Sequence, residues 1–270
     1  MSAQPVLPPE LEREVFEATA LMYCHIIPIL MRVARRIHIW IEPFLYRVVR
    51  AEYRTQAIID VLLNKSPTFC HLAVRHLALL DGSQQFSRDD AVQLLALCKG
   101  VTNLALGNSF MADPILIPIL AEMALLRLAV SVTDLGCDLS HPLFSSVTHL
   151  ILFDREEEVL LPLCAEIPNL ASLTHLCLFF DLPKHGVVSV LAESSRLKLF
   201  LILWPPGTEF NRTKTPHTED IRFVVGIYGN GYWDQWVDGA HGLPDYWTRG
   251  DALIAQKRNG EIEAARYWLE

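Results

Sequence analysis

Two histidines, His149 and His175, occupy the same place in two copies of a short apolar pattern, VTHLIL and LTHLCL. If the copies form neighbouring strands of one sheet, the two imidazoles lie side by side on one face, about 4.8 Å apart. A zinc ion needs about three or four well-placed ligands. The further candidates are Asp154 nearby and His76, which is three strands away. We therefore interpret the pair as part of a polar interaction surface, with no metal site.

Other motifs that could perform chemistry are weak. Gly226, Gly229 and Gly231 lie in GIYGNGYW, and they lack the spacing of a dinucleotide-binding loop. Three consecutive glutamates from Glu156 suit a solvated first helical turn, where the helix dipole favours carboxylates. The sequence contains no GxSxG, no Walker loop and no HExxH. We therefore predict no catalytic residue and no cofactor, and we expect that the protein is not an enzyme.

The composition indicates an ordered, core-rich chain. Of its 270 residues, 51% are hydrophobic and 20% are charged, and the formal net charge is -8. An acidic surface repels phosphate, so we expect no binding to nucleic acid or to membranes.

The six cysteines form no CxxC pair, and most lie in apolar runs, which is typical of buried thiols in a reducing compartment. The start of the chain does not resemble a signal peptide. The longest apolar stretch, 18–31, is interrupted by His25 and Pro28. We therefore expect a cytoplasmic or nuclear protein.

An apolar–x–x–Leu–x–apolar pattern recurs through the middle of the chain. Its copies start 27, 24, 22 and 26 residues apart, at Val74, Val101, Leu125, Val147 and Leu173. A looser sixth copy, LKLFLIL, begins at Leu197. Each copy alternates in the manner of a strand. Helical segments are expected between the copies, at 89–99, 114–123, 156–167 and 184–194.

A strand and a helix every 22 to 27 residues resemble a leucine-rich repeat. The resemblance covers about 70–204 and implies an α/β solenoid of short parallel strands alternating with helices. The family's Asn or Cys after each strand is missing, because Gly82, Ser109, Thr133, Arg155 and Asp181 stand there. We therefore expect an irregular, short arc over 51–204.

Alternation places every second strand residue on the open face of such an arc. Phe153, Phe179 and Trp204 then form an aromatic ladder, and His149 and His175 lie on the same face. An exposed apolar patch indicates either a partner or a covering segment. One interpretation makes these five residues the partner-binding surface. In the other, the aromatic C-terminal segment folds over them, as a permanent cover or as a lid.

The first 50 residues predict three helices separated by prolines. Pro8 and Pro9 precede an amphipathic segment in which Leu11, Val15 and Ala18 recur at helical spacing. Further helical elements are expected to begin at Pro28 and at Pro43. In the second of the three, an apolar stripe is expected; its members are Ile29, Leu30, Val33, Ile37 and Trp40.

The segment from Leu7 to Tyr46 resembles an F-box, especially the shortened version found in many fungal proteins. The matching residues are Leu7, Pro8, Glu10, Leu11, Val15 and Phe16, followed by Leu30, Val33, Arg36 and Trp40. The resemblance implies docking on the Skp-type adaptor of a cullin ubiquitin ligase. The adaptor-binding residues would be Leu7, Pro8, Leu11, Val15 and Phe16, and the repeat arc would hold an unknown substrate protein.

The last 66 residues, 205–270, differ in composition. A Pro- and Thr-rich loop follows Trp204, IRFVVGIY predicts one more strand, and 251–258 and 261–269 predict helices. We expect this mixed, aromatic-rich region to cap the arc.

We therefore expect a non-enzymatic substrate receptor of an F-box-type ubiquitin ligase. One alternative is a repeat scaffold without adaptor binding, in which the face from Pro8 to Phe16 packs against the repeats. The other is an enzyme with a deep pocket between Tyr228 and Tyr246.

Overall fold

A computed structural model describes residues 7–51, 56–80, 88–107, 115–206, 218–228 and 231–269. The positions Gly82, Ser109, Pro114 and Gly229, and most of the loop after Trp204, lie outside these described residues. No helix within the described part of the chain is long and apolar enough to cross a membrane.

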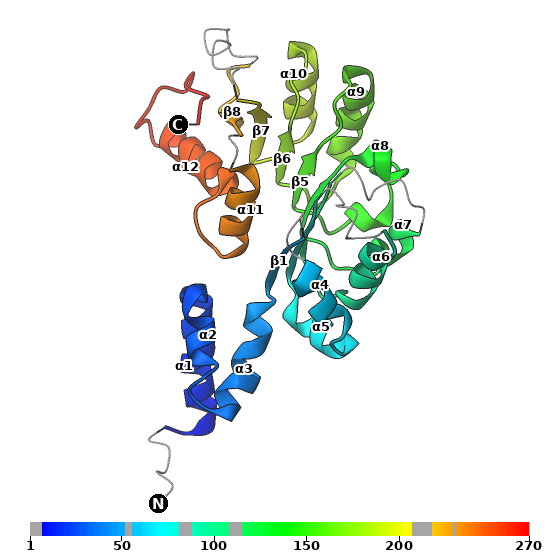
Figure 1. The fold of residues 1–270 in the computed structure, drawn as a ribbon. Helices are drawn as coiled ribbons and strands as arrows, with labels where there is room; N and C mark the ends of the chain where they lie inside the picture. The colour runs from blue at the N-terminus through cyan, green and yellow to red at the C-terminus, as the bar shows by residue number, and fades with distance from the viewer. Residues whose placement is uncertain are drawn as a thin grey trace, which may run out of the picture.

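The centre of the molecule is an eight-stranded sheet in which every neighbouring pair of strands is parallel. The strand order follows the chain from β1 to β8 without reversal (Figure 1). The strands are β1 (Val48–Ala51), β2 (His76–Leu79), β3 (Asn103–Leu106), β4 (Arg127–Val130), β5 (His149–Leu152), β6 (His175–Leu178), β7 (Leu199–Trp204) and β8 (Phe223–Ile227).

Helices that connect successive strands cover one face of this sheet (Figure 1). Leucines such as Leu77, Leu104 and Leu150 point from the strands into this layer and are fully buried. The helices are α4 (Gln56–Leu63), α5 (Pro67–Ala73), α6 (Arg88–Leu97), α7 (Leu116–Ala121), α8 (Val132–Leu135), α9 (Glu157–Glu166) and α10 (Lys184–Glu193), with short 3-10 turns at Pro142–Phe144 and Ile167–Asn169.

Two C-terminal helices, α11 (Tyr232–Ala240) and α12 (Tyr246–Arg258), cover the opposite face (Figure 1). Asp245 starts α12 with a capping box, because its carboxylate accepts from the Thr248 backbone N–H at 2.8 Å. Lys257, near the end of α12, donates to the backbone carbonyls of Ile221 and Phe223 at 3.3 and 3.2 Å. These contacts fix α12 to the β8 side of the sheet.

The predicted fold class, an irregular leucine-rich-repeat solenoid behind an F-box-like bundle and before a C-terminal cap, is wrong. The chain forms one open, all-parallel sheet that continues through β1 and β8, beyond the repeats at both ends. Both faces of this sheet are buried. The result is an open-sheet α/β fold, closer to the Rossmann type than to a solenoid with a helical N-terminus.

The physical reason lies in the face of the sheet that α11 and α12 cover, which we call the inner face. Its middle column consists of Ala78, Ala105, Ala129, Ile151 and Cys177, all of them buried. Strands that are apolar on both sides need a layer of helices on each face. The sheet also crosses the boundaries expected between the three segments of the chain. The strand β1 crosses the boundary between residues 50 and 51, and β8 continues the sheet beyond residue 204.

The N-terminal helices lie apart from the sheet, as Figure 1 shows in blue. They are α1 (Pro9–Met22), α2 (Ile27–Leu30) and α3 (Arg35–Leu45), with a 3-10 turn at Cys24–Ile26. Their small core contains Ala20, Ile27, Ile37 and Ile41. Pro43 lies inside α3 and does not begin a new element.

The C-terminal region differs from the prediction in two places: one predicted helix is absent, and one helix that was not predicted is present. The segment 261–269 is not helical; it runs past β8, where Trp268 forms a bridge with Val225. The helix α11 was not predicted from the sequence.

Candidate functional site

The two histidines lie together on the inner face of the sheet, as their spacing predicts. The rings of His149 on β5 and His175 on β6 stack at 4.1 Å between centroids, with 4° between their planes. Trp247 of α12 meets both rings edge-on, at 5.3 and 5.8 Å. The pair therefore packs under α12.

The polar contacts of the histidine pair are internal. Nε2 of His175 lies 3.2 Å from both carboxylate oxygens of Asp251 on α12, and this hydrogen bond lowers the pKa of Asp251. Burial lowers the pKa of His149 to about 3, with smaller contributions from the charges of His175 and Arg127. His149 is therefore neutral at physiological pH and supports the contact between the sheet and α12.

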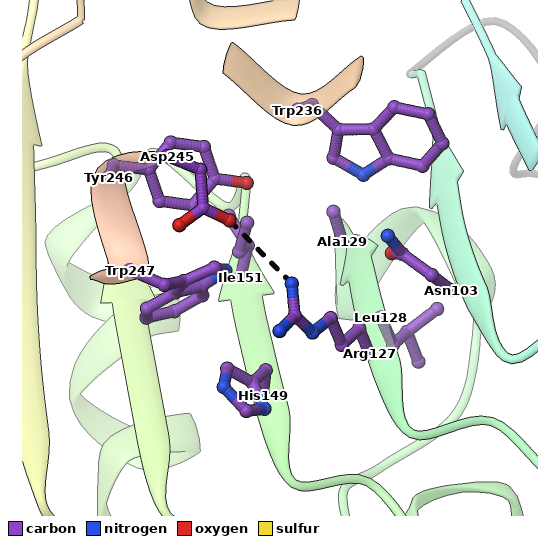
Figure 2. Close-up of a pocket in the computed structure, with 10 residues that line it drawn as sticks. All are labelled: Asn103, Arg127, Leu128, Ala129, His149, Ile151, Trp236, Asp245, Tyr246 and Trp247. Carbon is purple, nitrogen blue, oxygen red and sulfur yellow. Dashed lines mark ion pairs between the residues drawn. The ribbon is translucent and has the colours of Figure 1, made fainter. Parts of the chain in front are cut away.

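Figure 2 shows the adjoining part of the interface, where Arg127 of β4 points toward the carboxylate of Asp245. Nη1 of Arg127 lies 3.6 Å from Oδ2 of Asp245, whose side chain is only 3% exposed. The cavity between them measures about 10 Å³. It has room for about one water molecule, so it is packing space and not a ligand site.

The predicted aromatic ladder is correct in two of its three members. Phe153 and Phe179 contact each other edge-on at 5.0 Å between centroids. Phe179 also packs against Tyr228 and Tyr232, each at 4.7 Å, and is buried beneath them. The C-terminal segment therefore covers this part of the ladder.

Trp204 does not belong to the ladder. The structure pairs His175 with Leu199 and Cys177 with Leu201. The residue of β7 that continues the column of Phe153 and Phe179 is therefore Leu203. The prediction placed this strand one residue out of register, which exchanges the two faces of a strand. Trp204 packs on the opposite side of the sheet, 5.1 Å from the ring of Trp268.

The predicted partner-binding set of His149, His175, Phe153, Phe179 and Trp204 is therefore not a free surface. Four members lie beneath α11 and α12, and Trp204 lies in the other core. The residues that cover them, chiefly Tyr232 and Trp247, were not identified from the sequence. The helical spacing of Tyr232, Trp236 and Ala240, all buried, is the signal that could have revealed α11.

The predicted adaptor-binding residues lie on and just before α1. Leu7, Pro8, Leu11 and Val15 are exposed, whereas Phe16 packs partly into the core of the N-terminal helices. Leu11, Val15, Ala18 and Met22 follow at i, i+4, i+7 and i+11, and all four are exposed. The apolar side of α1 thus faces away from the core; we call these four residues the α1 stripe.

Exposed apolar side chains are concentrated in the N-terminal helices. Of the seventeen large hydrophobic residues exposed in the described chain, ten lie between Leu7 and Leu45. Soluble monomers rarely expose contiguous apolar surface of this kind unless it binds something. Of the predicted second-helix stripe, Leu30, Ile37 and Trp40 pack inward, while Ile29 and Val33 are exposed.

A cavity of about 150 Å³ lies at the end of β7 and β8, beneath α11 and α12. Tyr228, Tyr232 and Tyr246 line it, together with Gln235 and Arg249. The rings of Tyr232 and Tyr246 stack at 5.4 Å, and burial raises the pKa of both phenols. The aromatic segment thus packs mainly as a cover of the sheet.

No protein-family model matches the sequence, and no curated protein sequence matches it significantly. Among the described residues, no group of three or more His, Cys, Asp or Glu side chains is placed to hold a metal ion.

Proposed function

We propose that the chain is an interaction protein that docks through its N-terminal helices onto a Skp-type adaptor, as a substrate receptor of an F-box-type ubiquitin ligase. The observation that carries this proposal is the α1 stripe, whose apolar residues face outward from an otherwise folded segment. The resemblance of Leu7 to Tyr46 to an F-box supplies the partner.

The geometry favours the receptor over a scaffold without adaptor binding. In the scaffold, the face from Pro8 to Phe16 packs against the rest of the chain. Instead, Leu11 and Val15 have exposed fractions of 48% and 55%. Covering them on docking would contribute roughly 1 kcal/mol each, since full burial of such side chains is worth about 1.5–3 kcal/mol.

The N-terminal helices do not need the α1 stripe for their own stability. Their core is formed by the opposite side of α1, through Ala20 and Phe16, against α2 and α3. A bidentate contact between Arg36 of α3 and Glu12 of α1, at 2.7 and 2.8 Å, also holds the two helices together. Substitution of the stripe therefore tests docking without removing the core.

The decisive experiment is capture of the purified chain by an immobilised Skp-type adaptor. We expect Leu11→Asp/Val15→Asp to weaken capture at least about tenfold, because two charges would be buried without partners. Leu72→Asp/Val188→Asp, which alters two exposed apolar residues outside the N-terminal helices, is the matched control and should bind normally.

Thermal unfolding of both double variants verifies that they are folded. Adaptor binding that survives in a folded Leu11→Asp/Val15→Asp variant would reject the α1 stripe as the docking face. No binding by the folded wild-type chain would reject the receptor function.

A further inference from the structure

A further cavity, of about 300 Å³, lies between the N-terminal helices and the end of α11. Residues from α1 to α3 form one wall, and Gly239 to Gly242 form the other. Arg47 and His76, directly before and at the start of two neighbouring strands, form its floor. We call this cavity the Arg47 cleft. It is separate from the α1 stripe and from the packed face beneath α12.

The guanidinium of Arg47 has no counter-ion among the described residues. It is half-buried, and burial lowers its pKa, as does the charge of the neighbouring Arg75. The other cations nearby are already engaged, since Arg75 donates to the carbonyl of Gly100 at 2.9 Å and Arg127 pairs with Asp245. Arg47 is therefore a half-buried cation with no anionic partner among the described residues.

Two imidazoles stand beside Arg47 in the cleft. Nδ1 of His76 is buried and makes no hydrogen bond within the described chain. Arg47, His76 and His241 line the same cavity. Burial lowers the pKa of both imidazoles, and the charge of Arg47 adds to this. The carboxylate of Asp238 raises the pKa of His241, but it does not act on the pKa of Arg47 and is not its counter-charge.

The net charge of the cleft sets the class of ligand. Burial lowers the pKa of His76 to about 4, so this imidazole is neutral near pH 7. Arg47 is then the main uncompensated charge, which matches a single negative charge. A guanidinium binds a carboxylate through two parallel hydrogen bonds, and a neutral imidazole can provide one more.

The opposite wall of the cleft is apolar. Ala20, Leu21, Ile27 and Phe44 line it, and Ala240 continues this surface on the α11 side. An anion with an apolar body would place its charged end at Arg47 and its hydrocarbon part against this wall. A small inorganic ion would leave the wall in contact with water.

We propose that the Arg47 cleft binds a small hydrophobic carboxylic acid, whose carboxylate pairs with Arg47 and hydrogen-bonds His76, and whose hydrocarbon part lies against Leu21 and Phe44. The cleft would recognise the carboxylate by its charge and the hydrocarbon part by apolar contact. It is therefore a site for an organic monoanion. The site does not depend on adaptor docking.

Isothermal titration of the full chain with benzoate and with octanoate tests this inference. Benzyl alcohol and octanol serve as neutral analogues, and inorganic phosphate serves as a compact anion. We expect saturable binding of at least one carboxylate, about tenfold or more weaker binding of its alcohol, and no comparable binding of phosphate, because only the carboxylate combines a charged hydrogen bond with an apolar body.

The matched pair of variants is Arg47→Gln and Arg35→Gln. Arg35 is an exposed residue of α3 outside the cleft. Arg47→Gln should weaken carboxylate binding about 10- to 100-fold, while Arg35→Gln should bind like the wild type. Without ligand, Arg47→Gln should unfold at an unchanged or higher temperature, because it removes an unpaired cation.

Three outcomes would overturn the inference. They are the absence of carboxylate binding by the folded wild-type chain, equal binding of acid and alcohol, and full binding by Arg47→Gln. Tight binding of phosphate would instead identify a general anion site and would reject the role of the apolar wall.

Discussion

His149 shows at the residue scale how burial changes the behaviour of a side chain. Its imidazole stacks on His175 and meets the ring of Trp247 edge-on. Burial is the main cause of its lowered pKa; His175, Arg127 and Lys198 lower the pKa further, and Asp251 raises it. Protonation of His149 is therefore unfavourable in the folded chain.

This environment predicts that the protein loses stability as the pH falls. The pKa of His149 is about 3 in the folded chain against 6.5 for an unperturbed histidine, so the unfolded chain binds the extra proton between these values. The free energy of unfolding should fall by about 2 kcal/mol between pH 7 and pH 5 because of this group alone. Chemical denaturation at the two pH values measures the change.

The matched variants for this measurement are His149→Gln and His38→Gln. His149→Gln should reduce the difference between pH 7 and pH 5 by about 1–2 kcal/mol. His38 is exposed on α3, and His38→Gln should leave the difference as it is in the wild type. An unchanged pH dependence in His149→Gln would show that His149 is solvated in solution.

At the scale of the element, the turn between α11 and α12 positions the cover of the sheet. A Cβ atom at Gly239 would lie 2.2 Å from Oδ2 and 2.9 Å from Cβ of Asp245. Asp245 is the cap of α12 and the partner of Arg127, so the close approach of Gly239 holds α12 against the strands.

We expect Gly239→Ala to destabilise the protein, although alanine normally favours a helix by about 1 kcal/mol over glycine. Displacement of Asp245 would cost the α12 cap, about 1 kcal/mol, and further packing energy. The expected net loss is about 1–3 kcal/mol by denaturant unfolding. Gly231→Ala at the other end of α11 finds only an ordinary 3.8 Å contact and should lose at most about 1 kcal/mol, because alanine is a poorer N-cap than glycine. Equal stability of the two variants would contradict the close packing of this turn.

The sequence predicts the strands better than their assembly. The recurring Leu-x-apolar pattern places β2 to β6 correctly, because parallel strands with both faces buried need apolar residues in a short, regular run. The register of β7 was missed because LKLFLIL is apolar at almost every position, so alternation does not distinguish its two faces. This error of one residue placed Trp204 on the wrong face of the sheet.

The cover of the inner face could not be predicted from the strands alone. Phe153 and Phe179 indicate an apolar surface, but either a partner or the chain's own C-terminus satisfies that need equally well. Long-range pairs decide between them, such as His175 with Asp251 and Arg127 with Asp245. Likewise, helical spacing on α1 identified Leu11 and Val15 as one side of the helix, but it could not show that this side faces outward.

At the scale of the whole molecule, the chain combines a sheet whose two faces are both buried with N-terminal helices that expose many apolar side chains. The two cores beside the sheet are continuous and largely apolar, whereas the N-terminal core contains four buried residues. Under the proposed function, the interaction surface lies on the N-terminal helices, outside the two cores that flank the sheet.

Hydrogen–deuterium exchange of the full chain, with and without the Skp-type adaptor, tests this account most directly. We expect the adaptor to slow exchange in α1, and to leave exchange in α11 and α12 unchanged, because those helices are already packed on the sheet. Slower exchange confined to α11 and α12, or no change anywhere in the chain, would contradict docking through the N-terminal helices.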